Sequence, residues 1–326
     1  MRRIPASRPA SAGTWLAAAA AILAGAAVAN HLLARRSERR SPPRGRFLSV
    51  DGVRLHVIEA GAGPPVVLLH GNGAMAEDFV LSGVFGSLAR NHRVIAFDRP
   101  GFGHSDRPRS TVWTAAAQAA LIHHALRQMG VERPVLVGHS WGTLVALRMA
   151  LDHPADAAAL VLLSGYYTPT ARLDVVLASG PAIPLLGDIL RYTLAPLASL
   201  LILPLLFRRI FAPAPVPAHF RRGFPVGLAL RPSQLRASAA DTALMIPGAI
   251  AARHRHGELA MPVTILSGDG DRIVDLHRQA LRLHRELPHS TLHVVPGAGH
   301  MVYHTDPAAV VAAIEAAAPA GGVAPP

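Results

Sequence analysis

The chain has 326 residues, of which 51% are hydrophobic and 16% charged, so it can bury a large core. It contains no cysteine, which excludes disulfides and thiolate metal sites. The formal net charge is +12, but residues 1–46 hold nine arginines against one glutamate, which is +8 of that total. Because no basic face with interleaved aromatic residues follows, nucleic-acid binding is not predicted.

Residues 14–34 form an uncharged, alanine-rich run. At about 1.5 Å per helical residue, this run matches the ~30 Å hydrocarbon core of a bilayer, so we expect a single N-terminal membrane anchor. Arg35 and Arg36 favour the cytoplasmic side for the rest of the chain, although Arg2, Arg3 and Arg8 act in the opposite direction. The alternatives are a signal peptide cleaved at the A-x-A site of residues 27–29, which gives a secreted protein, and a disordered leader.

The next part of the chain alternates strands with helices. Residues 37–46 predict a polar linker, and residues 46–50 and 53–59 predict two strands joined by an Asp51-Gly52 turn. Short apolar runs predict strands that are buried on both faces, and longer amphipathic runs predict helices between them. The strand runs are 66–69, 94–97, 135–137 and 160–163, and the helix runs are 113–129 and 141–151. This alternation predicts a mostly parallel sheet with right-handed crossovers.

The pentapeptide Gly138-His139-Ser140-Trp141-Gly142 lies between a predicted strand and a predicted helix. A G-x-S-x-G sequence in this context is a nucleophile elbow. The tight turn forces its serine into a strained backbone conformation, and the glycines let the strand and the helix approach closely. The first N–H groups of the helix point toward an anion that forms at the serine. Ser140 is therefore the predicted nucleophile.

After residue 165 the alternation stops for about ninety residues, so residues 166–256 predict a separate insertion. Its run from 183 to 211 is strongly apolar, but Asp188, Arg191, Pro196 and Pro204 are expected to interrupt it. A second membrane span is therefore not predicted. The apolar residues are expected either to pack on the catalytic domain, or to line an acyl pocket or touch the membrane surface.

A serine nucleophile needs a base, and the base needs an acid that orients it. The predicted strand at 263–266 is followed by Asp271, and the predicted strand at 292–295 is followed by His300. Both residues, like Ser140, come just after the C-terminal end of a strand, where open α/β sheets place their sites. Asp269 and Asp275 are alternative acids.

Four motifs resemble the α/β-hydrolase fold superfamily over roughly residues 47–318. They are the elbow, the segment His70-Gly71-Asn72-Gly73, the segment from Phe97 to Ser105, and the Gly268-x-x-Asp271 and Gly297-Ala298-Gly299-His300 pair. The resemblance implies an α/β fold with a mostly parallel sheet flanked by helices. The expected divisions are an anchor and linker (1–46), a catalytic domain (47–165 and 257–318), a helical cap (166–256) and a C-terminal tail (319–326).

The resemblance also implies roles for single residues. Asp271 is preferred as the acid because it stands three residues after Gly268, as the acid of the family does. The backbone N–H groups of Asn72 and Trp141 are expected to form the oxyanion hole. His70 and Asp98 are expected to hold loops through hydrogen bonds. No cofactor or metal is expected, since neither His123-His124 nor His254-x-His256 has a histidine or carboxylate partner at metal-ligand spacing.

The expected function is that of a membrane-anchored serine hydrolase, carboxylesterase- or lipase-like, acting on a small apolar acyl ester. Haloalkane dehalogenases and epoxide hydrolases are set aside because they carry aspartate where this chain has Ser140. Carbon–carbon bond hydrolases and cofactor-free haloperoxidases keep the same triad and stay open as alternatives. A non-catalytic, membrane-tethered binding protein is the alternative from another class. Fold alone fixes neither the substrate nor the oligomeric state.

Overall fold

An eight-stranded sheet forms the centre of the computed structural model, which describes residues 11–318. The strand order is β1-β2-β4-β3-β5-β6-β7-β8, in which β2 pairs antiparallel with β1 and β4 and the other neighbours are parallel. The strands are β1 (Arg46–Val50), β2 (Val53–Ala60), β3 (Pro65–Leu69), β4 (Arg93–Phe97), β5 (Val135–His139), β6 (Ala159–Leu163), β7 (Val263–Gly268) and β8 (Thr291–Val295). The predicted fold class is confirmed.

The hairpin between β1 and β2 has the predicted turn at Asp51 and Gly52. Asp51 and Gly52 both have positive φ, at 49° and 76°, which the two central residues of a tight hairpin turn require. Val50 then pairs with Val53 directly across the turn.

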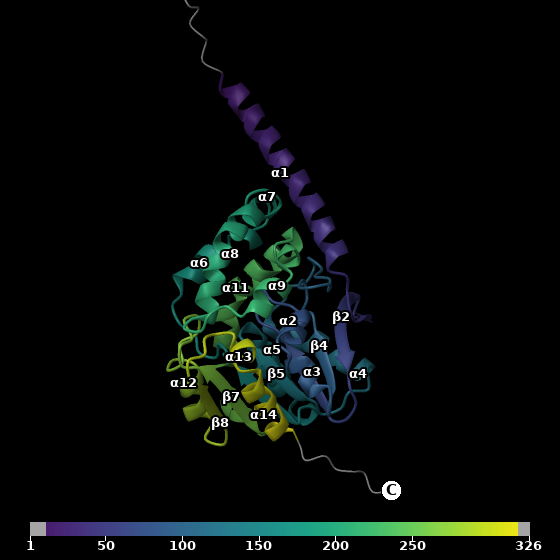
Figure 1. The fold of residues 1–326 in the computed structure, drawn as a ribbon, viewed down its shortest axis with the longest axis vertical. Coiled ribbons are helices and arrows are strands. Elements are labelled where there is room, and N and C mark those ends of the chain that lie inside the picture. The colour runs from purple at the N-terminus through teal and green to yellow at the C-terminus, as the bar shows by residue number, and fades with distance from the viewer. Residues whose placement is uncertain (1–10, 319–326) are drawn as a thin grey trace, which may run out of the picture.

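Helices cover both faces of the sheet, so the residues of β5, β6 and β7 are all buried and those of β3 nearly so. On one face, α4 (Ala115–Gln128), α5 (Trp141–Asp152) and α12 (Ala280–Glu286) share a core with the sheet. On the other face, α2 (Ala76–Leu81), α3 (Val84–Leu88), α13 (Val302–Thr305) and α14 (Pro307–Ala317) share a second core. Figure 1 shows these layers around the strands.

The chain between β6 and β7 is helical and lies over one end of the sheet (Figure 1). We call residues 166–256 the cap. Its helices are α6 (Leu173–Ala178), α7 (Leu186–Tyr192), α8 (Ala195–Phe211), α9 (Ala218–Gly223), α10 (Val226–Ala229) and α11 (Pro232–Ala252).

The expectation that Asp188, Arg191 and Pro204 interrupt this run was wrong, because α7 contains the first two and α8 continues through Pro204. A proline inside a helix removes one backbone N–H donor. The interruption lies instead at residues 193–194, between α7 and α8.

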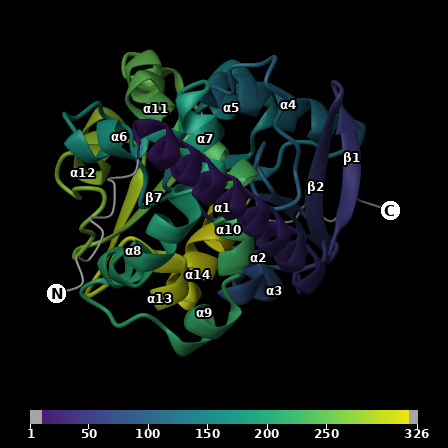
Figure 2. The same ribbon diagram turned by 90° about the horizontal axis from the view of Figure 1, so that it is seen from above.

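Helix α1 (Ala12–Arg40) extends away from the body past the cap, and from above it crosses the end of the body near α7 and α10 (Figures 1 and 2). It is long and apolar enough to cross a bilayer, with a mean hydropathy of 1.8 over its best window, none of which is buried. The predicted linker is wrong for residues 37–40, which are helical. The Ser37 hydroxyl donates to the carbonyl of Leu33, and Glu38 pairs with Arg231 at 3.0 Å, so this last turn is held in place. Arg2, Arg3, Arg8 and the predicted tail lie outside the described residues.

Replacing Gly142 by alanine is expected to destabilise the protein. An added Cβ would lie 2.2 Å from the carbonyl oxygen of Leu69 and 2.6 Å from that of His70, and both atoms belong to the backbone. We expect a loss of roughly 1–3 kcal/mol, measured as a lower midpoint of thermal unfolding in detergent. Gly86→Ala in α3 is the control, since nothing lies within 4 Å of its Cβ position. Equal midpoints for the two variants would contradict the close contact at Gly142.

Candidate active site

Ser140 occupies the turn between β5 and α5, with φ 50° and ψ −119°. A positive φ is unusual for a residue with a side chain, so the predicted strain at the elbow is confirmed. The turn can close because Gly138 has no Cβ: an added Cβ would lie only 2.7 Å from the carbonyl oxygen of Gly142. The serine side chain is consequently presented at the carboxyl end of the strand and is half-buried.

The structure brings together the three side chains that the sequence singled out. The Oγ atom of Ser140 lies 2.9 Å from Nε2 of His300, and Nδ1 of His300 lies 2.8 Å from Oδ2 of Asp271. With Nδ1–H donating to the carboxylate, Nε2 is left as the acceptor for the serine proton. This is the arrangement of a nucleophile, a general base and an orienting acid.

Asp271 is held more firmly than either alternative acid. Its side chain is fully buried, and Oδ1 accepts the backbone N–H groups of Ile273 and Val274 at 2.8 and 2.9 Å. Asp269 and Asp275 are exposed and accept loop amides instead, at 2.8 and 2.7 Å. The geometry therefore favours Asp271.

The loop that carries His300 is clamped from two sides. The backbone N–H of His300 donates to the carbonyl of Ile210 at 2.9 Å, near the end of α8 in the cap. On the other side, Nε2 of His139 lies 3.0 Å from the carbonyl oxygen of His300. Burial, together with the adjacent His300 ring, lowers the pKa of His139 far below its usual value, so His139 is neutral and donates through Nε2–H. Sequence reasoning assigned no role to His139, although it lies inside the elbow motif.

The predicted oxyanion-hole residues adjoin the serine. A Cβ at Gly71 would lie 3.1 Å from the Cβ of Ser140, so the loop that contains Asn72 packs directly against the nucleophile. The Asn72 side chain donates to the carbonyl of Ser238 and to the hydroxyl of Thr242 in α11, at 3.1 and 2.8 Å. Within residues 11–318, no hydrogen bond engages the backbone N–H of Asn72 or of Trp141. Both groups are therefore free to bind a substrate oxygen.

A buried ion pair joins this loop to the cap. Arg99 lies 2.6 Å from Asp241 of α11, and neither side chain is exposed. Arg99 also donates to the carbonyls of His70 and Gly71 at 2.8 and 3.1 Å, and its guanidinium stacks 4.6 Å from the ring of Trp141. The indole N–H of Trp141 in turn donates to the carbonyl of Asp241 at 2.7 Å. Asp241 thus connects the loop of residues 70–72 and the elbow in one network, and sequence reasoning did not identify it.

His70 and Asp98 hold loops, as expected. Burial, and then the charge of Arg99, lower the pKa of His70 to about 3, so its ring is neutral. Its Nδ1–H donates to the carbonyl of Gly71 at 2.7 Å, and its Nε2 accepts the backbone N–H of Arg99 at 3.0 Å. Asp98 accepts the backbone N–H of Ala76 at 2.7 Å, which ties the loop after β4 to α2.

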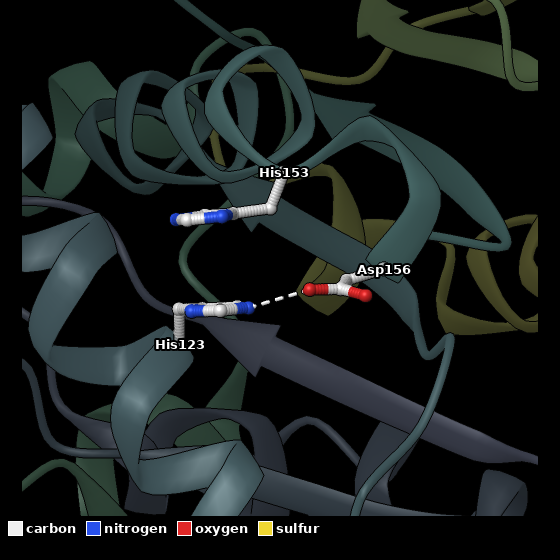
Figure 3. A group of neighbouring side chains, drawn as sticks. All are labelled: His123, His153 and Asp156. Atoms are coloured by element: carbon white, nitrogen blue, oxygen red, sulfur yellow. Dashed lines mark hydrogen bonds and ion pairs between the residues drawn. The ribbon is translucent and has the colours of Figure 1, made fainter.

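His123, of the His123-His124 pair, has partners that the sequence spacing did not indicate. Nε2 of His123 in α4 lies 2.7 Å from Asp156, and its ring stacks on that of His153 at 3.7 Å (Figure 3). One possible ligand atom from each residue lies within 4.8 Å of the other two. The rings are parallel to within 2°, so their nitrogen lone pairs lie in two parallel planes, and a ring would have to turn for both to point at one ion. As they stand, the three side chains connect α4 to the end of α5.

Comparison with known proteins places the chain in a family. A family model described as the alpha/beta hydrolase fold matches residues 64–307, and the chain belongs to this family. An uncharacterised protein of Mycobacterium tuberculosis is 30% identical over 300 residues, covering 84% of this chain and 81% of the relative. A 2-hydroxy-6-oxo-2,4-heptadienoate hydrolase of Pseudomonas putida is 29% identical over 262 residues, covering 79% and 90%.

Solved structures agree with this fold. A membrane phospholipase A described as a bacterial virulence factor aligns with a TM-score of 0.63 at 21% identity, covering 93% of this chain and 95% of that one. An esterase from Exiguobacterium antarcticum aligns with a TM-score of 0.65 at 23% identity, covering 83% and 98%. Together with the hydrolases among the sequence relatives, the family identifies the protein as a hydrolase.

The choice of acid can be tested directly. Asp271→Asn is expected to lower kcat by about 10⁴-fold, because the amide NH2 group can donate to Nδ1 of His300 and so favours the wrong tautomer. The matched control is Asp269→Asn, which affects an exposed loop contact and should stay within a few-fold of the parent. Rates on a soluble p-nitrophenyl ester measure both. A larger loss for Asp269→Asn would show that the acid is misassigned.

The buried ion pair predicts a large stability effect. Asp241→Ala leaves the charge of Arg99 buried with less compensation and is expected to cost about 3–5 kcal/mol. Asp174→Ala is the control, since Asp174 is 62% exposed and pairs with Arg172 at the surface, where ion pairs contribute little. Midpoints of thermal unfolding compare the two. Similar midpoints would show that Arg99 does not depend on Asp241.

Proposed function

We propose that this hydrolase is a serine carboxylesterase that cleaves esters with an apolar acyl group. The observation that carries the proposal is the continuous hydrogen-bonded chain from Ser140 through His300 to the buried Asp271. The free N–H groups of Asn72 and Trp141 beside the serine support it. Roles follow from this geometry: Ser140 is the nucleophile, His300 the base and Asp271 the orienting acid.

In the first half of the proposed reaction, Oγ of Ser140 attacks the ester carbonyl carbon while its proton moves to Nε2 of His300. The carbonyl oxygen becomes an oxyanion, which the N–H groups of Asn72 and Trp141 bind. The tetrahedral intermediate then breaks the bond to the leaving oxygen. That oxygen takes the proton from His300 and departs as the alcohol, which leaves an acyl-enzyme on Ser140.

In the second half, His300 takes a proton from water as the water oxygen attacks the acyl carbon. The same two N–H groups bind the second oxyanion. Collapse releases the carboxylic acid, and the proton on His300 returns to Oγ of Ser140. Asp271 stays ionised throughout and stabilises the imidazolium that forms in each half.

The apolar acyl group and the membrane anchor are part of the same proposal. The cap reaches the site through α11, which holds Asn72 and Trp141, and through α8, which holds His300. Its aliphatic composition suits a hydrocarbon chain better than a polar one. Helix α1 serves as a membrane anchor, with Arg35 and Arg36 favouring the cytoplasmic side for the catalytic domain.

Carbon–carbon bond hydrolysis is a second candidate. The Pseudomonas putida relative, which aligns with 79% of this chain, is named as a hydrolase of a 2-hydroxy-6-oxo-dienoate, a substrate without an ester bond. The same serine and base would serve a ketone in place of an ester. A panel of p-nitrophenyl esters of rising acyl length, tested beside a 2-hydroxy-6-oxo-dienoate, separates the two reactions.

Ser140→Ala tests the proposal itself. We expect it to abolish labelling by a fluorophosphonate probe and to lower ester hydrolysis by at least ~10³-fold, since the triad acts as a unit. Ser164→Ala is the control, because Ser164 also has a positive φ after a sheet strand but is fully buried. Retained labelling in Ser140→Ala would refute the assignment of the nucleophile.

A further inference from the structure

Exposed large apolar side chains are concentrated on α1 and on the cap. Among residues 11–318, those outside α1 and residues 173–206 are Phe47, Val112, Ile250 and Val294. We call residues 183–202 the cap face; it includes Leu185 at 80% exposed and Leu201 at 74%. Soluble monomers rarely expose so large a group of apolar side chains without a partner.

The cap face carries little free charge, and exposed basic residues lie next to it. The charged residues of the cap face are Asp188 and Arg191, which pair with each other, and Asp188 also pairs with Arg109 at 2.8 Å. Exposed cations lie beyond the apolar surface, at Arg208 and Arg209 on α8 and at Arg35 and Arg36 on α1. An apolar face bordered by basic residues is typical of proteins that lie in a membrane interface.

The contact between α1 and the cap fixes the position of the cap face along α1, and so relative to a bilayer that α1 spans. The side-chain amide of Asn30 donates to the carbonyls of Tyr192 and Thr193, at 2.9 and 2.8 Å, where α7 ends. Helix α1 begins at Ala12, so it rises only ~27 Å before it reaches Asn30. Since a bilayer core is ~30 Å thick, a spanning α1 brings the attached end of the cap to the membrane boundary.

The shape of the cap at this point fits the same surface. Residues 173–182 and α7 together are apolar enough for a membrane span, but they bend by 86° at the break between them. A bend of this size is found in broken membrane spans and in re-entrant loops, and a re-entrant loop returns to the side from which it entered. Of the cap helices, α7 and α10 contact α1, which from above crosses over this end of the body (Figure 2).

We propose that the cap face lies in the interfacial layer of the bilayer that α1 spans, with its leucines against the acyl chains. This docking surface rests on the proposed span of α1 and not on the reaction at Ser140. A further consequence rests on the proposed function: an ester with a long acyl chain enters the site from the bilayer rather than from water.

The absence of native cysteine allows a direct test on the full chain. Leu185→Cys and Leu197→Cys each carry an environment-sensitive fluorophore after reconstitution into phosphatidylcholine vesicles. Val294→Cys is the matched control, since Val294 is 40% exposed on β8, at the opposite end of the body from α7 (Figure 1). Doxyl-labelled phosphatidylcholine is expected to quench both cap labels several-fold more than the control.

Equal quenching at the cap face and at Val294 would overturn the proposal. So would disulfide cross-linking of Leu185→Cys between two copies without quenching by lipid, because the occupant would then be a second chain. The readout does not use catalysis, so it stands whether or not Ser140 is a nucleophile.

An activity measurement gives a second, independent result. Leu185→Glu combined with Leu197→Glu is expected to lower hydrolysis of a vesicle-embedded long-chain ester by about tenfold or more, because carboxylates are costly in lipid. Hydrolysis of a soluble short-chain ester should stay unchanged, as it should for Val294→Glu on both substrates. An equal loss on both substrates in the double variant would contradict entry from the bilayer.

Discussion

The buried contact between Arg99 and Asp241 is the constraint on which the site depends. Arg99 follows β4, and Asp241 belongs to α11 in the cap, so one ion pair connects two parts of the chain that are far apart in sequence. Through Arg99 the pair holds the carbonyls of His70 and Gly71, and through the backbone carbonyl of Asp241 it holds the indole of Trp141. The cap is therefore part of the machinery that positions the site.

Much of the fold could be predicted from the sequence because it depends on patterns of neighbouring residues. Apolar runs gave the strands, and the elbow motif gave the strained turn at Ser140, since each depends on neighbours a few residues away. The order of Ser140, Asp271 and His300 was sufficient to nominate a triad. Their approach in space follows from the sheet, which brings the carboxyl ends of its parallel strands together.

Contacts between distant segments could not be predicted in this way. No motif in the sequence includes Asp241, and nothing near it indicates that it pairs with Arg99. The partners of His123 were hidden for the same reason, because His153 and Asp156 follow a different helix. Local propensity also misjudged Pro204, which lies inside α8, and the last turn of α1, which Glu38 anchors to the body.

Helix α8 has a consequence of its own for how the enzyme would respond to its surroundings. One end begins at the cap face, and near the other end the carbonyl of Ile210 holds the backbone of His300. A tilt of α8 at the cap face would therefore move the carbonyl that the backbone N–H of His300 contacts. Activation at an interface would then need no moving lid: the bilayer itself would act as an allosteric effector, with α8 as the connection.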